Sequence, residues 1–483
     1  MAHGVTIQEQ ATSIVAPAQV ASAIPVVVGT APVNLSKRAK TPVNEPVLVY
    51  SFAEAVAAFG YSDDFASYTL CEFIDSHFRL FGLAPVVLIN VLDPADHKTA
   101  VAAADVTVTS GAAKLAVKGI ILSSLSVKSA DGETTYVAGT DYTAAFDSDG
   151  HVIVTRKATG SIPAIATELK ISYDKLDPAA IQAADVIGGV DGATGALTGL
   201  ELINQVFPRF GLVPSLILAP GYAQDPTVAA VMVAKAGNIN GHFQALALTD
   251  APTTGEEALY TAVPAWKNDN SYTSTLQVVG WPKVKLGDKH YHLSTQTAGA
   301  IGATDAAYGG IPYASPSNKA LKANGAVVAD GSEVFLGPDQ AAYLNGQGIV
   351  TALNFVGGWK LWGNNTGAYP ANTDAKDAFI PIRRMFNWIR TSIVLTYWQK
   401  VDDPTNKKLI ETVTDSINYW LNGLTASGAL LGGRVEFNAS ENPMTDLLAG
   451  IIRFHVHIAP PGPAQEMNFI LEYDPSYLGS LFA

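Results

Sequence analysis

The chain of 483 residues is poor in charge and in cysteine. Charged residues make up 15% of it, below the roughly 25% usual for soluble domains, which suits a subunit with extensive protein contacts or a large Ala/Gly-rich monomer. A net charge of −13 argues against a general nucleic-acid binder, which needs basic surface. The single cysteine, Cys71, excludes a disulfide framework and fits synthesis in a reducing compartment.

Long apolar runs are also missing. The N-terminus has no basic segment followed by an apolar one, so no signal peptide is expected. No run approaches the ~18 apolar residues that a spanning helix needs. These absences predict a soluble protein made in the cytosol, without membrane insertion.

Motifs that carry chemistry are incomplete. There is no Walker A sequence and no Gly-x-Ser-x-Gly elbow, and Gly346-Gln347-Gly348 lacks a third glycine. The glycines of 188–192 indicate a turn-rich loop, and Asp147-Ser148-Asp149-Gly150 is a hairpin turn without the rest of a calcium loop. We therefore expect no enzyme activity and no cofactor.

Two histidine pairs remain as metal candidates. His290 and His292, and likewise His455 and His457, are two positions apart and so share one strand face. Neither pair has a third ligand nearby in the sequence, so we expect solvent-facing histidines and no metal. Cys71 lies on the apolar face of a helix, where a buried thiol is inert.

Alternating apolar residues are present near both ends. Phe454, Val456 and Ile458 alternate with polar residues, as in a half-buried strand, and the stiff run 460–463 follows. A second alternating run then predicts a strand-bearing arm with the apolar residues Met467, Phe469, Leu471 and Tyr473. At the other end Val5 and Ile7 alternate in the same way, and residues 10–23 indicate a linker. An apolar arm is expected to dock on a surface of its own subunit or of another.

The rest of the chain alternates between strand and helix patterns. Strands are predicted at 24–29, 47–49, 85–91, 215–219, 242–248 and 275–281, and helices at 52–59, 70–81, 226–236, 254–265, 382–398 and 408–424. Between Asp96 and Asp177, short alternating runs are separated by Asp-Gly turns, which favours an all-β insertion. The predicted fold class is mixed α/β (α+β): a layered sheet core with flanking helices, an inserted small all-β domain and extended terminal strand arms.

These patterns divide the chain into six predicted parts. They are an N-terminal arm (1–23), the first part of the α/β core (24–95), the inserted peripheral β domain (96–178), the second part of the core (179–350), a C-terminal domain (351–460) and a C-terminal arm (461–483).

A group of aromatic and basic residues lies in the predicted C-terminal domain. Its members are Trp359, Trp362, Arg383, Arg384, Trp388, Arg390 and Trp398. Stacked Trp and Arg can bind single-stranded nucleic acid, but the acidic balance of the chain argues against it. The same residue types are enriched in protein interfaces, so core and interface packing is the favoured interpretation.

Six runs of residues share a further similarity. They are Gly4-Val5 through Val28-Gly29-Thr30-Ala31, Tyr313–Lys319, Gly357–Asn364, Arg383–Ile389, Gly432–Phe437 and Leu471–Leu478. Taken together, these runs resemble contractile phage tail sheath proteins. The resemblance covers nearly the whole chain except the β insertion.

The resemblance implies a structural subunit of a virion tail or tail-like particle, synthesised in the cytoplasm of a bacterial host. Such subunits form six-membered rings stacked helically around an inner tube, and their partners include baseplate and tail terminator proteins. Their arms add strands to neighbouring subunits, here Val5, Ile7 and the 467–473 run donating to Phe454, Val456 and Ile458. The tube contact would come from 422–448, with the charged residues Arg434, Glu436, Glu441 and Asp446.

Two other readings stay open from residues alone. An α/β enzyme could bind a nucleotide or a sugar in a sheet crevice. Another self-assembling subunit, of a capsid or a surface layer, would also carry arms at both ends. A phage tail, a phage-tail-like bacteriocin and a related injection device all use such subunits.

Overall fold

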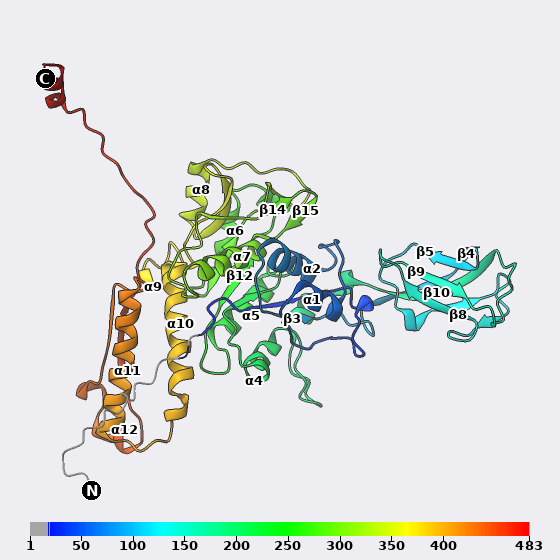
Figure 1. The fold of residues 1–483 in the computed structure, drawn as a ribbon, viewed down its shortest axis with the longest axis horizontal. Coiled ribbons are helices and arrows are strands. Elements are labelled where there is room, and N and C mark those ends of the chain that lie inside the picture. Colours follow the sequence, from blue (N-terminus) through cyan, green and yellow to red (C-terminus); the bar gives the residue numbers. More distant parts are fainter. Residues whose placement is uncertain (1–17, 19, 483) are drawn as a thin grey trace, which may run out of the picture.

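The computed structural model describes residue 18 and residues 20–482. The molecule is elongated: a β unit lies at one end, an α/β body in the middle and a pair of long helices at the other end, where the C-terminal tail leaves the body (Figure 1). Among the described residues, no helix is both long and apolar enough to cross a membrane.

A nine-stranded sheet forms the centre of the body. Its strands, in spatial order, are β16 (Lys319–Ala320), β19 (Trp359–Trp362), β18 (Ile349–Asn354), β13 (Gln277–Gly280), β12 (Leu246–Asp250), β11 (Leu216–Leu218), β1 (Pro25–Gly29), β3 (Val86–Asn90) and β2 (Val47–Val49). The six central strands are parallel. Toward the edges each strand pairs antiparallel with its inner neighbour: β2 with β3, β19 with β18, and β16 with β19. The continuous apolar sequences of the central strands follow from burial on both faces.

Short helices cover this sheet. They are α1 (Phe52–Phe59), α2 (Thr69–Ile74), α3 (Ala183–Ile187), α4 (Val206–Phe210), α5 (Pro226–Gly237), α6 (Val263–Asp269), α7 (Leu293–Ala307), α8 (Pro338–Asn345) and α9 (Ala375–Ala378). Side-chain caps begin α1, α5 and α9: Ser51 accepts from Glu54 N–H, Asp225 from Thr227 N–H and Asp374 from Lys376 N–H. In α7, Gly299 lets the ring of Phe81 approach, since a Cβ there would lie 2.3 Å from it.

A separate seven-stranded antiparallel sheet, here called the β4–β10 unit, extends from the body (Figure 1). Its strands are β4 (Lys98–Thr109), β5 (Ala112–Leu115), β6 (Ser126–Lys128), β7 (Thr135–Tyr136), β8 (Tyr142–Phe146), β9 (Val152–Arg156) and β10 (Glu168–Leu176). The unit has its own apolar core, around Val127, Val152 and Ile171. Asp177 N–H donates to the His97 carbonyl oxygen (3.0 Å), so the chain enters and leaves the unit at one place.

The C-terminal elements pack around another separate core. They are α10 (Ile380–Tyr397), α11 (Lys407–Ala426), β20 (Gly432–Glu436), α12 (Met444–Leu448) and β21 (His455–Ala459). Met385 and Ile389 of α10 meet Val413, Ile417 and Leu421 of α11 in this core. The apolar face predicted for 408–424 is therefore the buried face of α11.

Some predicted elements differ from the structure. The helix predicted over 254–265 is wrong: a 3-10 turn spans Gly255–Ala258, and α6 begins only at Val263. Pro264 has no backbone N–H to donate and is therefore favoured in the first turn of a helix, so a helix begins near it and does not end there. The helix predicted over 70–81 is α2 followed by a π-helical segment, Asp75–Leu80. The strand predicted at 242–248 begins later, at Leu246.

A three-stranded sheet lies above the carboxyl ends of the parallel strands. It consists of β14 (Lys283–Leu286), β15 (Lys289–Tyr291) and β17 (Gly325–Val327). Strands β18 and β19 fall almost wholly in the predicted 351–460 domain, yet they hydrogen-bond within the nine-stranded sheet.

Candidate assembly interface

The segment predicted to receive a strand forms a two-stranded sheet on α11. β21 pairs antiparallel with β20, with Val456 opposite Val435. Val456 and Ile458 pack against the C-terminal core, and Phe454, just before β21, does the same. The predicted strand is therefore present, although it begins at His455 and not at Arg453.

The two outer edges of this sheet differ. Val435 N–H donates to Asn418 Oδ1 (2.8 Å), and Asn418 Nδ2 donates to the Val435 carbonyl oxygen (3.2 Å), so α11 caps β20 at this position. Because backbone groups alternate in direction along an antiparallel ladder, the opposite residue Val456 points its N–H and C=O away from β20. Within the described residues no strand lies on that outer side of β21.

The four residues predicted to touch a tube surround the same sheet. Arg434 Nε donates to Glu436 Oε1 (2.6 Å), and this bond lowers the pKa of Glu436. Glu441 Oε1 lies 2.6 Å from His455 Nδ1. Arg453 forms an ion pair with Asp446. All four are thus paired inside the subunit, and exposed pairs of this kind are easily exchanged because each contributes little to stability. Contact with a tube stays a prediction.

The first part of the C-terminal tail is held by its own subunit. Residues 461–465 and Met467 lie along a groove whose other wall includes Tyr313, Asn318 and Trp362. Gln465 Nε2 donates to Asn364 Oδ1 (2.8 Å) at the end of this segment. The groove sets the direction in which the rest of the tail leaves.

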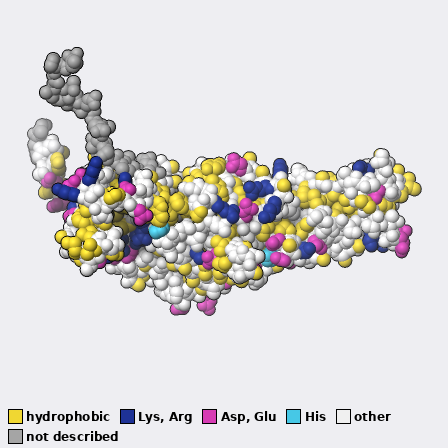
Figure 2. Space-filling model, turned by 90° about the horizontal axis from the view of Figure 1, so that it is seen from below, with side chains coloured by type: hydrophobic (Ala, Val, Ile, Leu, Met, Phe, Trp, Pro, Cys, Tyr) yellow, Lys and Arg dark blue, Asp and Glu magenta, His cyan; other side chains and the backbone are white. Residues whose placement is uncertain are grey.

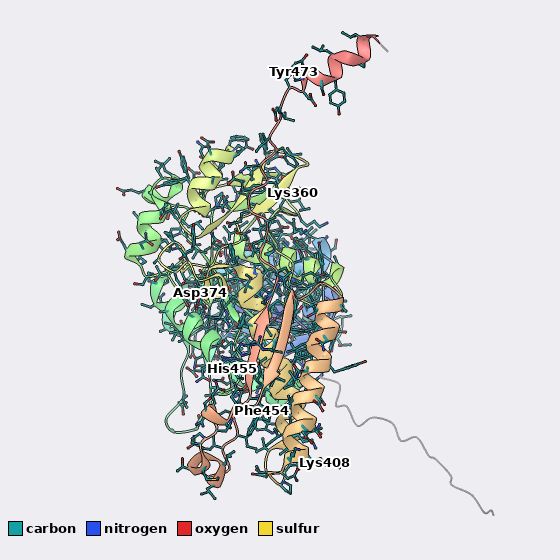
Figure 3. The ribbon with its side chains drawn as sticks, turned by 90° about the vertical axis from the view of Figure 1, so that its left-hand side faces the viewer. Lys360, Asp374, Lys408, Phe454, His455 and Tyr473 are labelled. Carbon is teal, nitrogen blue, oxygen red and sulfur yellow. The ribbon has the colours of Figure 1, made fainter. Side chains whose placement is uncertain are left out.

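Beyond Gln465 the tail projects into solvent (Figures 1 and 3). Phe469 and Leu471 are 82% and 96% exposed, and Tyr473 is similarly exposed. The prediction of a formed strand over 467–473 is wrong for the single chain, since these residues have no regular structure, and a 3-10 segment, Pro475–Phe482, follows. A strand requires a partner for its ladder, and an isolated chain offers none here.

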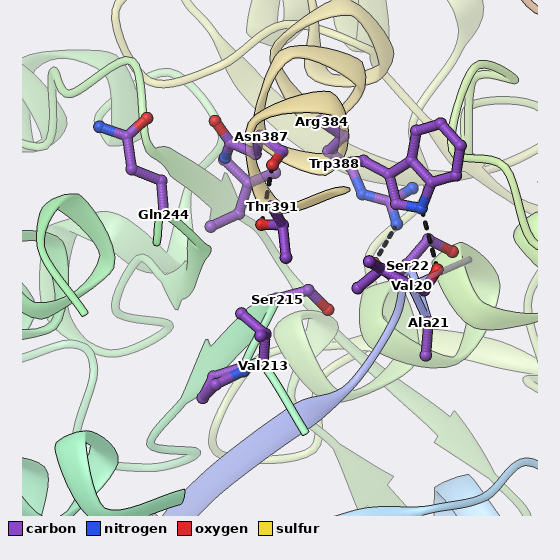
Figure 4. Close-up of a pocket in the computed structure, with 12 residues that line it drawn as sticks. Val20, Ala21, Ser22, Val213, Ser215, Gln244, Arg384, Asn387, Trp388 and Thr391 are labelled. Carbon is purple, nitrogen blue, oxygen red and sulfur yellow. Dashed lines mark hydrogen bonds between the residues drawn. The ribbon is translucent and has the colours of Figure 1, made fainter. Parts of the chain in front are cut away.

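The N-terminal prediction is tested only in part. Val5 and Ile7 lie outside the described residues. Residues 18 and 20–24, here called the strap, cross α10 and are held by it (Figure 4). Ala18 N–H donates to Thr396 Oγ1 (2.9 Å), and Trp388 Nε1–H donates to the Val20 carbonyl oxygen (2.9 Å). The described part of the segment predicted as a linker (10–23) thus has no regular structure, but it is fixed to α10.

A buried ion pair completes the attachment of the strap. Arg384 donates to both carboxylate oxygens of Asp305 in α7 (2.8 and 2.5 Å) and to the Ser22 carbonyl oxygen (3.1 Å). Ser22 Oγ–H donates to the same carboxylate (2.5 Å). Both charged side chains are almost fully buried, and removing one partner of such a pair costs about 3–5 kcal/mol. The strap, α7 and α10 are therefore joined in one network.

The remaining signature residues are spread over the fold. Trp359 packs on the body core, and Trp362 lines the groove of the tail. Arg383 pairs with Asp377 (3.0 Å). Trp398 meets His242, with ring centroids 5.0 Å apart. The structure thus brings Arg384 and Trp388 together at the strap and separates the other members.

The histidine prediction is wrong for His292, which is buried and not solvent-facing. It precedes α7, its Nδ1 lies 2.7 Å from Glu72 Oε2, and its backbone N–H also donates to Glu72. Nearby, Asp250 accepts from the Ser294 hydroxyl (2.5 Å). His455 and His457 do reach the surface, stacked at 4.2 Å. Burial raises the pKa of Cys71 to about 12, as expected for an inert thiol.

Two features were recognised only in part, or not at all, from the sequence. The hairpin at 147–150 places ligand atoms of Asp147, Asp149 and His151 within 4.8 Å, although Lys114 already pairs with Asp147 (2.7 Å). The strap was missed because Ser22 and Val20 are unremarkable in sequence. Arg384 and Trp388, two large polar-headed residues one turn apart in α10, were the available signal.

Comparison with known proteins gives the family. The chain is 33% identical to the tail sheath protein of Burkholderia phage BcepMu, over 99% of this chain and 98% of that protein. The chain belongs to the tail sheath protein family. This sheath protein is also 28% identical to a prophage major tail sheath protein of Pseudomonas aeruginosa, over 62% of this chain and 74% of the relative. No family model matches it.

Solved structures share the fold of this sheath protein. One is the sheath complex of the PVC extracellular contractile injection system in its contracted state, with a TM-score of 0.58, 15% identity and 99% of each chain covered. Another is the helical sheath of the anti-feeding prophage in its contracted state, with a TM-score of 0.58, 17% identity and coverage of 98% of this chain and 99% of that chain. The resemblance noted in the sequence is confirmed.

Proposed function

We propose that this sheath protein is the structural subunit of a contractile tail. It polymerises as a helix of hexameric rings around an inner tube, and the polymer shortens to drive the tube through a bacterial envelope. The full-length similarity to a phage tail sheath protein carries the proposal. The shared fold with two contracted sheaths supports it.

Neighbouring subunits are linked by strand addition at β21. The support is the uncapped outer edge of β21, where Val456 offers an N–H and a C=O, beside a β20 edge that Asn418 already occupies. An added strand gains affinity from backbone hydrogen bonds and its register from alternate side chains. The arm that binds at β21 is therefore expected to present its apolar side chains on one face.

The C-terminal tail is the donor of that strand. Its apolar side chains alternate and are exposed, a state that costs free energy unless another surface covers them. Gln465 holds the base of the tail against Asn364. The segment that follows Gln465, which comes after β21 in the chain, leaves the body. These features favour pairing with a neighbour over pairing with its own subunit. Val5 and Ile7 are the proposed donor residues at the other end.

Contraction follows from two packings of the same subunits. The extended sheath is metastable, the contracted one has the lower free energy, and contact with a baseplate relieves the barrier between them. Covalent continuity between the body and its arms transmits the movement of one ring to the next. No nucleotide is required.

The other parts take peripheral roles in this assembly. The β4–β10 unit is an inserted domain on the periphery, which is supported by its own core and its adjacent entry and exit. The inner tube is contacted through Arg434, Glu436, Glu441 and Asp446. Baseplate and tail terminator proteins meet the two ends of the polymer.

Negative-stain electron microscopy of the purified protein tests the proposal. We expect hollow tubes with a helical surface lattice. Monomers or closed shells at every concentration tried, with no tubes, would contradict it.

A further inference from the structure

An exposed apolar hairpin tip projects from the nine-stranded sheet. Phe355 and Val356, between β18 and β19, are 69% and 73% exposed. The tip is tightly built: Asn354 pairs with Trp359, and Gly357 and Gly358 take φ angles of 75° and 86°, which favour glycine. Such a preformed loop loses little conformational freedom when it binds.

An apolar groove of about 390 Å³ lies at the end of α10. Aromatic rings line it in contact with one another, Phe207 with Phe243 (5.1 Å) and His242 with Trp398 (5.0 Å), beside Val394 and Leu395. No Lys, Arg, Asp or Glu lines it. Trp398 is 59% exposed. On the face seen from below, hydrophobic side chains reach the surface in many places (Figure 2). Aromatic-lined grooves of this size commonly take up an apolar anchor.

The tip and the groove lie at opposite ends of the parallel strands. β18 runs parallel to β13 and β12, and the tip follows its carboxyl end. The groove is built from residues that precede β11 and β12, together with the last turn of α10. In Figure 3, Lys360 beside the tip lies in the upper part of the molecule, whereas Figure 1 has α4 at the bottom. The tip therefore cannot fill the groove of its own subunit.

We propose that the 354–359 hairpin tip of one subunit docks into the aromatic groove of a second copy, with Phe355 as the anchor. This inference rests on the proposed sheath assembly and adds a contact made by the bodies, separate from the arms. Because the two surfaces differ and lie at opposite ends of the subunit, the contact is head-to-tail. Such a contact builds an open polymer when the rotation from one subunit to the next does not close into a ring.

Opposite charges lie close in the sequence to the two surfaces. Lys360 follows the tip, and its side chain lies against Gly357. Asp402 and Asp403 follow Trp398 and are exposed, and Lys400 already pairs with Asp403 (3.1 Å), so Asp402 is the candidate partner of Lys360. An ion pair at the edge of an interface affects the relative orientation of the partners and the rate of association more than the affinity. The C-terminal tail is a poorer occupant, because residues 466–474 have no regular structure and would lose more conformational freedom on binding than the preformed tip.

Disulfide trapping between two single variants tests the contact. V356C protein is mixed with W398C protein, assembled and oxidised. The native thiol does not interfere, since Cys71 is fully buried. We expect covalent dimers from the mixture and little from either variant alone, and a ladder of oligomers from the V356C/W398C double variant. F335C, at an equally exposed phenylalanine elsewhere (75%), is the matched control and should give no dimers with W398C.

Each other outcome overturns the proposal. Dimers from V356C alone would mean that two tips meet symmetrically. Trapping of W398C by L471C in place of V356C would assign the groove to the tail. Tubes that form without any V356C–W398C product would remove this contact and leave the sheath function standing, whereas a wild-type protein that forms no tubes would remove the function itself.

A concentration series gives a second measure. F355S should raise the protein concentration needed for tubes about tenfold or more, because it truncates an interface anchor. F335S should leave that concentration unchanged. Circular dichroism shows that both variants are folded, and equal effects of the two would sink the proposal.

Discussion

Trp388 donates its indole N–H to the carbonyl oxygen of Val20 across 368 positions of the chain. This bond attaches the strap to α10 just before the chain enters β1, an inner strand of the nine-stranded sheet. A pull on the N-terminal arm therefore reaches α10, and through Arg384 and Asp305 it reaches α7, before it reaches the sheet.

Trp388→Phe should loosen the strap without disturbing its surroundings. The ring that packs on Trp420 is kept, while the Val20 carbonyl loses its donor, which costs about 1–3 kcal/mol. We expect lower stability in urea and faster hydrogen exchange in residues 18–24. Trp398→Phe, at an exposed position, is the control and should change neither. Unaltered exchange in the strap of Trp388→Phe would show that the bond does not hold it.

Deletion of residues 466–483 should give a folded subunit that no longer forms long sheaths. The cut leaves Gln465 on Asn364, so the body and the tail groove stay intact. Electron microscopy is the measurement, and normal sheaths from this truncation would rule out the tail as donor. As matched substitutions, Leu471→Ser should weaken assembly more than Ile470→Ser, since only Leu471 lies on the predicted apolar face.

Val456→Pro should block strand addition and leave β20–β21 formed. Proline removes the N–H that Val456 directs outward, and it is tolerated on an edge strand where that N–H faces solvent. His457→Pro is the contrast, because it removes a donor from the internal ladder and should lower stability as well. We expect Val456→Pro to melt within a few degrees of the wild type and to form no long tubes. Full assembly would place the receiving edge elsewhere.

Replacement of residues 98–176 by a short linker should leave polymerisation intact. The His97–Asp177 hydrogen bond brings the two ends together, and the unit carries its own core. The body loses a few contacts, including the bond from Asn34 to the Ile120 carbonyl oxygen, so a small drop in stability is expected. Thermal unfolding and microscopy are the measurements. Loss of tubes from a folded variant would mean that the unit takes part in assembly.

Acid should destabilise the subunit through His77. Burial lowers the pKa of His77 to about 3, from an ordinary value near 6.5. Below pH ~6.5 the unfolded chain binds a proton that the folded chain excludes. The stability from this group is therefore complete above pH ~6.5 and is lost as the pH falls toward 3, by up to about 1.4 kcal/mol per pH unit.

His77→Phe keeps a ring stacked on Phe73 and removes the titration. Its unfolding free energy should fall less steeply than that of the wild type between pH 6.5 and 5. His77→Gln should flatten the same slope, although its packing differs. Parallel slopes in all three proteins would show that His77 is protonated in the folded state.

The sequence predicted elements whose cause is local. Helix α11 has its apolar face at intervals of three and four residues, and β3 is a continuous apolar run, so each could be assigned from its own residues. The sheath resemblance rests on short runs along the chain in the same way. Hairpin turns at Asp131-Gly132 and Asp149-Gly150 likewise depend on adjacent residues.

Contacts between distant residues needed the tertiary structure. His292 was predicted to face solvent from its strand pattern, but its partner Glu72 is 220 positions away. The position of the strap depends on its contacts with Trp388 and Arg384. Likewise, Asn418 decides which edge of the β20–β21 sheet is capped and which is open. The tail shows the limit most clearly: its alternation predicts a strand, but a strand exists only with a ladder partner, and the described tail meets none within its own subunit. Local periodicity reports which face of an element is apolar, whereas packing of distant segments decides what covers that face.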